Sequence, residues 1–222
     1  MTLLRFAALP ATAALVAFGV WVTGGWLSND FRVSMGLTAA WLTIAAAGCA
    51  AVAWRVRPLR VPVLVGYTLS AAAIGIYLGL TTLRDRVVDE HVVTGAPPTA
   101  APASTTRAPA RGVELHRARF RSLEHETTGT AAVVRLADGR RFATVTGFAT
   151  SPGPDLRVRL VPGDSPAGDA AGAVDLGALK GNRGDQQYAI PAGVRVAGRT
   201  LVIWCRAFSA PFGSARLSSQ VL

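Results

Sequence analysis

The sequence contains few of the residues that carry most enzyme chemistry. Its 222 residues include two cysteines, Cys49 and Cys205, three histidines and one lysine, Lys180. Two cysteines cannot build a disulfide framework or a cysteine-rich metal site. No GxSxG, HExxH, Walker, CxxC or Rossmann glycine pattern occurs. The sequence therefore names no reaction, and it favours a protein that is not an enzyme.

Charged residues are also scarce. They make up 16% of the chain, against about a quarter in a typical soluble domain. Half of the residues are hydrophobic, and the mean hydropathy is +0.35, which excludes disorder over most of the chain. This composition favours a membrane anchor joined to one domain of modest size.

Three uncharged apolar runs cover residues 6–27, 33–54 and 61–83, and each is 22 or 23 residues long. A bilayer core about 30 Å thick needs about 20 apolar residues per helix, so each run is long enough to span. The first run exceeds the apolar region of a signal peptide, which is about 7–15 residues long. We therefore predict three transmembrane helices within residues 1–91, with the lipid bilayer as their partner.

The charges of the connecting loops predict the orientation of these helices. Residues 55–60 contain three arginines and no acid, whereas residues 28–32 contain one arginine and one aspartate. By the positive-inside rule the second loop is cytoplasmic. The N-terminus is then cytoplasmic as well, and everything after the third helix is extracytoplasmic. The expected localisation is the cell membrane, as a multi-pass protein.

Small residues in the third run suggest close packing between helices. Gly75 and Gly79 form a GxxxG pair, a pattern that lets helix backbones approach in lipid. A general abundance of alanine and glycine in the chain explains the same pattern equally well.

The rest of the chain divides into a linker and a domain. Residues 92–111 are rich in proline, alanine and threonine and have no hydrophobic period, which predicts an extended linker. Residues 112–222 read as strands throughout: Asp138-Gly139 is a strong hairpin signal, and Leu156, Val158 and Leu160 alternate with two arginines. The expected fold is a membrane α-helical anchor followed by an all-β domain, an antiparallel β-sandwich.

The predicted β domain is basic, with 14 basic and 9 acidic residues. A basic exterior domain suits acidic envelope polymers, anionic lipid headgroups or another membrane protein as partners. A solvated arginine-rich surface with no specific ligand explains the same charge. Nucleic acid is not expected, because the arginines are not interleaved with aromatic residues that could stack on bases.

Four segments of this domain, residues 125–130, 146–156, 176–191 and 202–217, resemble the DM13 family in order and spacing. The resemblance covers about residues 113–218 and does not extend to the membrane region. The residues that carry it include Gly153, Pro154, Asp155, Gly181, Gly184, Gln186, Tyr188 and Trp204.

The resemblance implies a β-rich module for which electron transfer has been proposed, centred on the cysteine of the Trp-Cys strand, here Cys205. It also implies a histidine at position 125, and one histidine with one cysteine could ligate a haem or a metal. The residues themselves favour another role, since Cys205 shares a strand face with Leu201 and Ile203 and is expected to be a buried, inert core residue.

Two functions therefore remain open. The favoured one is a non-enzymatic binding or interaction module of the cell envelope, and the alternative is a redox module that uses Cys205, with or without a haem or metal. Of the other motif residues, Asp155 is expected to close a turn. Gln186 and Tyr188 are expected to form loop hydrogen bonds and packing contacts.

Overall fold

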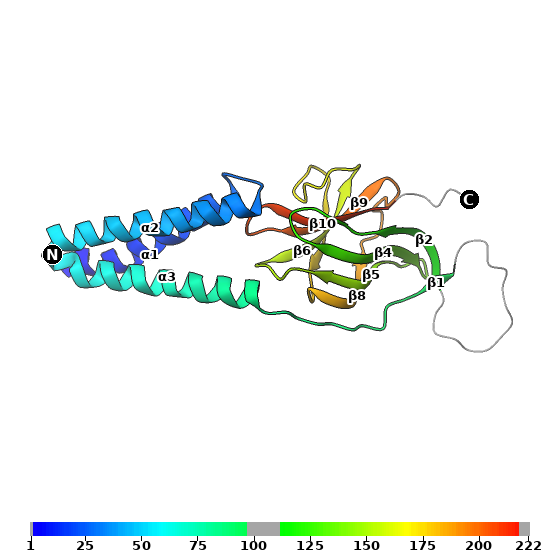
Figure 1. Cartoon of the computed structure of the whole chain (residues 1–222), viewed down its shortest axis with the longest axis horizontal. Helices are drawn as coiled ribbons and strands as arrows, with labels where there is room; N and C mark the ends of the chain where they lie inside the picture. The colour runs from blue at the N-terminus through cyan, green and yellow to red at the C-terminus, as the bar shows by residue number, and fades with distance from the viewer. Residues whose placement is uncertain (1, 97–111, 218–222) are drawn as a thin grey trace. The chain divides into compact units, whose positions relative to one another are not determined.

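The structure, a computed structural model, describes residues 2–96 and 112–217. These residues form two compact units (Figure 1). The helical unit contains residues 2–83 and 206–209, and the β unit contains the described residues of 84–205 and 210–217. The last part of the predicted linker, residues 97–111, lies outside the described residues.

The helical unit confirms the three predicted apolar helices. They are α1 (Thr2–Gly25), α2 (Phe31–Arg55) and α3 (Arg60–Leu83), with the 3₁₀ turn η1 (Arg57–Leu59) before α3. All three are long and apolar enough to cross a bilayer. The start of α2 is capped by Asp30, whose carboxylate accepts a hydrogen bond from the Val33 amide at 2.9 Å.

Packing among the helices uses glycines other than the predicted pair. A Cβ added at Gly66 of α3 would lie 2.9 Å from the Leu9 carbonyl oxygen of α1, so the two helices approach closely there. Cβ atoms at Gly75 and Gly79 would meet no described atom within 4 Å. The predicted GxxxG contact is therefore wrong within the described residues. The motif pattern does not reveal which face of α3 turns toward its neighbours.

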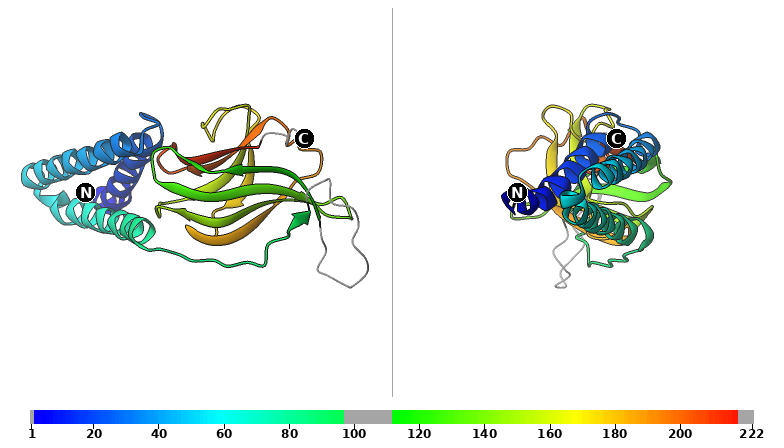
Figure 2. Two further views of the ribbon diagram at one scale, coloured as in Figure 1. Left: turned by 45° about the vertical axis from the view of Figure 1, so that its right-hand side comes forward. Right: turned by 90° about the vertical axis from the view of Figure 1, so that its left-hand side faces the viewer.

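The β unit consists of two sheets, as predicted for an antiparallel β-sandwich (Figure 2). One sheet has the order β1-β2-β4-β5-β8 and the other the order β3-β10-β9-β6-β7. All pairs are antiparallel except the short pair β1–β2. The bounds of the strands are β1 (Gly95–Ala96), β2 (Gly112–Arg119), β3 (Arg121–Ser122), β4 (Thr127–Arg135), β5 (Arg141–Thr150), β6 (Leu156–Pro162), β7 (Val174–Ala178), β8 (Arg183–Ile190), β9 (Arg199–Cys205) and β10 (Ala210–Leu217).

The core of the β unit follows the alternation in the sequence. On β6, Leu156, Val158 and Leu160 are buried, while Arg157 points to the other face and pairs with Asp175 of β7 at 2.9 Å. The predicted hairpin joins β4 to β5, and Gly139 takes the positive φ of 84° that its turn requires.

Strand β9 is buried on both faces. It lies between β6 and β10, and Leu201, Ile203 and Cys205 on one face are fully buried. On the other face Trp204 is only 3% exposed, because the loop between β6 and β7 lies on its ring. A Cβ at Gly168 of this loop would come within 2.4 Å of the Trp204 side chain.

The first residues after α3 belong to the β unit. We call residues 84–94 the connector; they run along the outer edge of β8 (Figures 1 and 2). Val87 bridges Arg183 in parallel, and the Glu90 amide donates to the Asp185 carbonyl at 2.8 Å. The sequence predicts that residues 84–91 belong to the membrane region and residues 92–94 to the linker, whereas the structure places the connector beside β8.

Candidate functional site

Cys205 is the last residue of β9, opposite Leu156 of β6 and Ala210 of β10. Its side chain is completely buried, and its thiol donates a hydrogen bond to the Pro154 carbonyl oxygen at 3.0 Å. A thiol in such a position is shielded from other thiols and from soluble oxidants, since reactive cysteines sit in partly exposed sites.

His125 lies in the turn between β3 and β4, near the same end of the β unit. Its ring lies over the Phe212 ring, with centroids 3.8 Å apart and planes at 31°. A Cβ at Gly153 would lie 2.8 Å from the Phe212 ring, and Pro154, the next residue, accepts the Cys205 thiol. The structure thus brings His125 and Cys205 into one neighbourhood, connected through Phe212 and the turn at residues 153–154.

The two candidate ligands of this neighbourhood, Cys205 and His125, both contact neighbouring residues. Across residues 2–96 and 112–217, no group of three or more His, Cys, Asp or Glu side chains could hold a metal ion. The Cys205 thiol donates its proton to the Pro154 carbonyl, and Phe212 packs against one face of the His125 ring. A metal-bound sulfur would be a thiolate and would lose the hydrogen bond to Pro154, so the thiol in this arrangement does not fit a metal ligand.

The turn at residues 153–155 is shaped by its backbone. Asp155 adopts a φ of 53°, in the left-handed region that aspartate tolerates better than most residues. Its carboxylate lies 3.9 Å from the Arg157 guanidinium. The turn positions the Pro154 carbonyl that receives the Cys205 thiol.

Gln186 is the centre of the second motif region, in β8. Its side chain is fully buried, and its Oε1 accepts from the amides of Lys180 and Gly181, both at 3.1 Å, and from the Tyr188 hydroxyl at 2.7 Å. Its Nε2 donates to the Gly181 carbonyl at 2.7 Å. The buried side-chain amide of Gln186 thus forms hydrogen bonds with the backbone of the loop before β8. Its own polar atoms are paired in return, as is usual for buried polar groups.

Tyr188 is held in its protonated form. Burial, first of all, and the negative charge of Glu90 raise the pKa of Tyr188 to about 12, although the Lys180 backbone hydrogen bond acts in the opposite direction. The phenol therefore stays neutral at physiological pH, and it serves as a hydrogen-bond donor to Gln186.

Asn182 ties the same loop to the connector. Its Nδ2 donates to the Asp85 carboxylate at 2.7 Å, and its Oδ1 accepts from the Arg86 amide at 2.6 Å. Across the sheet, Nδ2 also donates to the Thr150 carbonyl at 3.0 Å. The sequence analysis did not identify this role, because nothing in the periodicity of residues 84–94 indicates a partner strand.

The two motif glycines leave room for the connector. A Cβ at Gly181 would lie 2.5 Å from the Arg86 carbonyl oxygen, and a Cβ at Gly184 would lie 2.3 Å from the Val88 carbonyl oxygen. Gly184 also has a φ of 95°, where other residues are strained. Residues 181–186, Gly-Asn-Arg-Gly-Asp-Gln, therefore act as a holder for an extended segment.

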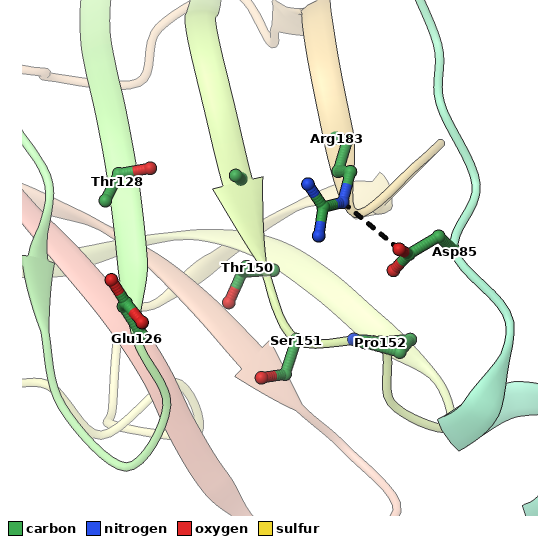
Figure 3. Close-up of a pocket in the computed structure, with 8 residues that line it drawn as sticks. Asp85, Glu126, Thr128, Thr150, Ser151, Pro152 and Arg183 are labelled. Atoms are coloured by element: carbon green, nitrogen blue, oxygen red, sulfur yellow. Dashed lines mark ion pairs between the residues drawn. The ribbon is translucent and has the colours of Figure 1, made fainter.

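An open polar pocket of about 320 Å³ lies beside this holder (Figure 3). At its edge Arg183 pairs with Asp85 at 3.2 Å. Ser151 and Pro152 line this pocket, and the turn at residues 153–154 follows them directly in the chain. The complete lining is Asp85, Glu126, Thr128, Ala149, Thr150, Ser151, Pro152 and Arg183.

A family model described as "Electron transfer DM13" matches residues 119–217. The match covers most of the β unit and excludes both the helices and the connector. No curated protein and no solved structure matches the chain.

A side chain at position 181 would clash with the connector, so a substitution there should destabilise only a protein that contains the connector. Gly181→Ala should lower the unfolding free energy of a fragment of residues 84–222 by about 1–3 kcal/mol, because the added methyl overpacks against the connector. In a fragment of residues 112–222 the same change should stay within about 0.5 kcal/mol. Denaturant unfolding of the four proteins measures both values. An equal cost in both fragments would contradict the role assigned to the connector.

The ion pairs of the β unit predict acid sensitivity. Burial raises the pKa of Glu90. The hydrogen bonds from the Lys180 side chain and the Gln187 amide, together with the positive charge of Lys180, lower it by more, so the pKa of Glu90 lies below the ordinary 4.5. The stabilisation by the ionised carboxylate is complete above pH 4.5 and is lost as the pH falls through the lowered pKa. Unfolding free energies at a series of pH values should therefore decline below about pH 4.5.

The matched variant for this measurement is Glu90→Gln, which removes the titrating group and keeps a hydrogen-bonding side chain. Its acid decline should be shallower than that of the unmodified protein. Curves of the same slope would show that Glu90 does not contribute.

Proposed function

Given that the chain carries a DM13 domain, we propose that the protein is a membrane-anchored, non-enzymatic binding module of the cell envelope. The observation that carries this proposal is the complete burial of Cys205, with its thiol donated to the Pro154 carbonyl. A thiol that is buried and hydrogen-bonded in this way supports the fold. It exchanges no electrons with a thiol partner in the folded state.

The other motif residues support the same proposal. Gln186, Tyr188 and Asn182 direct their polar atoms at backbone groups, at one another and at the connector. What the β unit offers to other molecules is therefore its outer surface, which is basic, and its open polar pockets. Such a surface suits acidic envelope material or a membrane protein as partner.

Electron transfer through Cys205 is the second candidate. The description of the matching family model favours it, as does the position of Pro152, which lines the polar pocket two residues before Pro154, the hydrogen-bond partner of the thiol. Under this alternative, loss of the thiol abolishes function at almost unchanged stability.

We further propose that the β unit is extracytoplasmic, on the basis of the arginine-rich loop between α2 and α3. An alkaline phosphatase fused after Leu222 should be active, since this reporter folds only outside the cytoplasm. A fusion in the loop at residues 55–60 should be inactive and serves as the control. The reverse pattern would place the β unit in the cytoplasm.

The complete burial of Cys205 predicts that its thiol reacts slowly in the folded protein. In the full chain carrying Cys49→Ala, which leaves Cys205 as the one thiol, alkylation by a small maleimide should be slower by orders of magnitude in the folded protein than in the denatured protein. Equal rates would contradict the sealed thiol.

Substitutions at Cys205 separate the two candidates further. Cys205→Ala should cost about 1–2 kcal/mol, because it leaves a small cavity and a buried Pro154 carbonyl without its donor. Cys205→Ser should cost less, since the hydroxyl still donates. Binding of the folded variants to isolated envelope fractions should equal that of the unmodified chain. Loss of binding in both folded variants would show that the Cys205 thiol takes part in the function and would contradict its purely structural role.

A further inference from the structure

A second open pocket, of about 380 Å³, lies on the outer face of the sheet that contains β9 and β10. It is lined by Ala118, Arg119, Arg121, Asp164, Thr200, Ser214 and Arg216. No motif of the sequence analysis pointed to it, because its residues come from four separate stretches of the chain.

The register of three neighbouring strands explains why these residues converge. Arg121 of β3 is opposite Ser214 of β10, and Arg216 of β10 is opposite Thr200 of β9. Directly opposed residues of antiparallel strands point to the same face. Ser214 and Thr200, only 4% and 2% exposed, form the floor.

The loop after β6 completes the wall of this pocket. The Thr200 hydroxyl donates to the Gly163 carbonyl at 2.7 Å, which holds the loop beside β9, and the next residue, Asp164, pairs with Arg216. The pocket is therefore built by the sheet and a fixed loop, and it does not depend on a long mobile segment.

The charge in this pocket is unbalanced. It contains three guanidinium groups and one carboxylate, and that carboxylate is already paired with Arg216. Among the described residues, neither Arg119 nor Arg121 has an acidic partner within ion-pair distance. Other arginines of the β unit, such as Arg117 and Arg157, do have one. Two arginines without an acidic partner among the described residues thus lie beside a cavity that can receive a ligand.

The chemistry of the lining indicates an anion of a particular kind. Guanidinium groups bind phosphate oxygens with paired hydrogen bonds, and the Ser214 hydroxyl on the floor can donate to the same group. The lining contains no aromatic ring on which a base or a sugar could stack. We infer that this arginine pocket binds the phosphate ester group of an envelope ligand. The inference deepens the binding role proposed above and rests on it.

The test uses the full chain in neutral phosphatidylcholine nanodiscs with four probes: inorganic phosphate, oligo(glycerol phosphate), vesicles containing phosphatidylglycerol, and polyglutamate. Arg119→Ala/Arg121→Ala should weaken binding of the phosphate ester probes at least about tenfold, because it removes two charge-assisted contacts. Arg135→Ala/Arg195→Ala removes the same charge from exposed positions outside the pocket. This control should change binding less than about threefold.

The probes also identify the source of the phosphate. Preference for oligo(glycerol phosphate) points to a polymer, and preference for the vesicles points to a lipid headgroup; either supports the inference. Arg119→Lys/Arg121→Lys keeps the charge and the fold but loses the paired geometry, and should bind more weakly than the unmodified chain.

Three results would overturn the inference: no binding of any phosphate probe, equal losses in the pocket and control variants, or polyglutamate binding as tightly as oligo(glycerol phosphate). Failure of the inference and failure of the proposed function are distinguishable. A chain that binds isolated envelope material but no phosphate probe keeps the binding role and loses the pocket assignment. A chain that binds no envelope material loses the binding role, whatever the phosphate probes show.

Discussion

The buried side-chain amide of Gln186 is the interaction on which the motif region depends. Its four hydrogen bonds satisfy the backbone of Lys180 and Gly181 and orient the Tyr188 hydroxyl. An unsatisfied amide in this position would cost about 1–3 kcal/mol per lost group. With the loop held in this way, Asn182 and the two motif glycines meet the connector, so that the first residues after α3 run as an extended segment along the edge of β8.

Much of the fold could be predicted from the sequence, because it follows from local patterns. Three long apolar runs, the Asp138-Gly139 turn and the alternation on β6 each express one periodicity or one turn preference. The connector could not be predicted, since its partner lies about a hundred residues away and its own residues have neither period. The arginine pocket could not be predicted for the same reason: Arg119, Asp164 and Arg216 lie on β2, on the loop after β6 and on β10, which are far apart in the sequence. The burial of Cys205 was predictable from its strand face, whereas its Pro154 partner was not.

The DM13 motifs and the open surfaces of the domain have separate roles in this account. The motifs shape the turn at residues 153–155 and the holder for the connector, and they place the Cys205 thiol in the core. The open surface contains two polar pockets. One has a paired Asp85 and Arg183 at its edge, and the other contains Arg119 and Arg121, which have no acidic partner among the described residues. Under the proposed function, binding depends on residues outside the motif positions, and these residues decide which ligand the domain takes.

The most direct test of the central claim is a redox titration of the purified full chain, followed by its absorbance and by the number of thiols that react after denaturation. Our account predicts no reversible redox transition and two reactive thiols, Cys49 and Cys205, at every potential at which the protein stays folded. A reversible one-electron transition that disappears in the folded Cys205→Ala variant would contradict it.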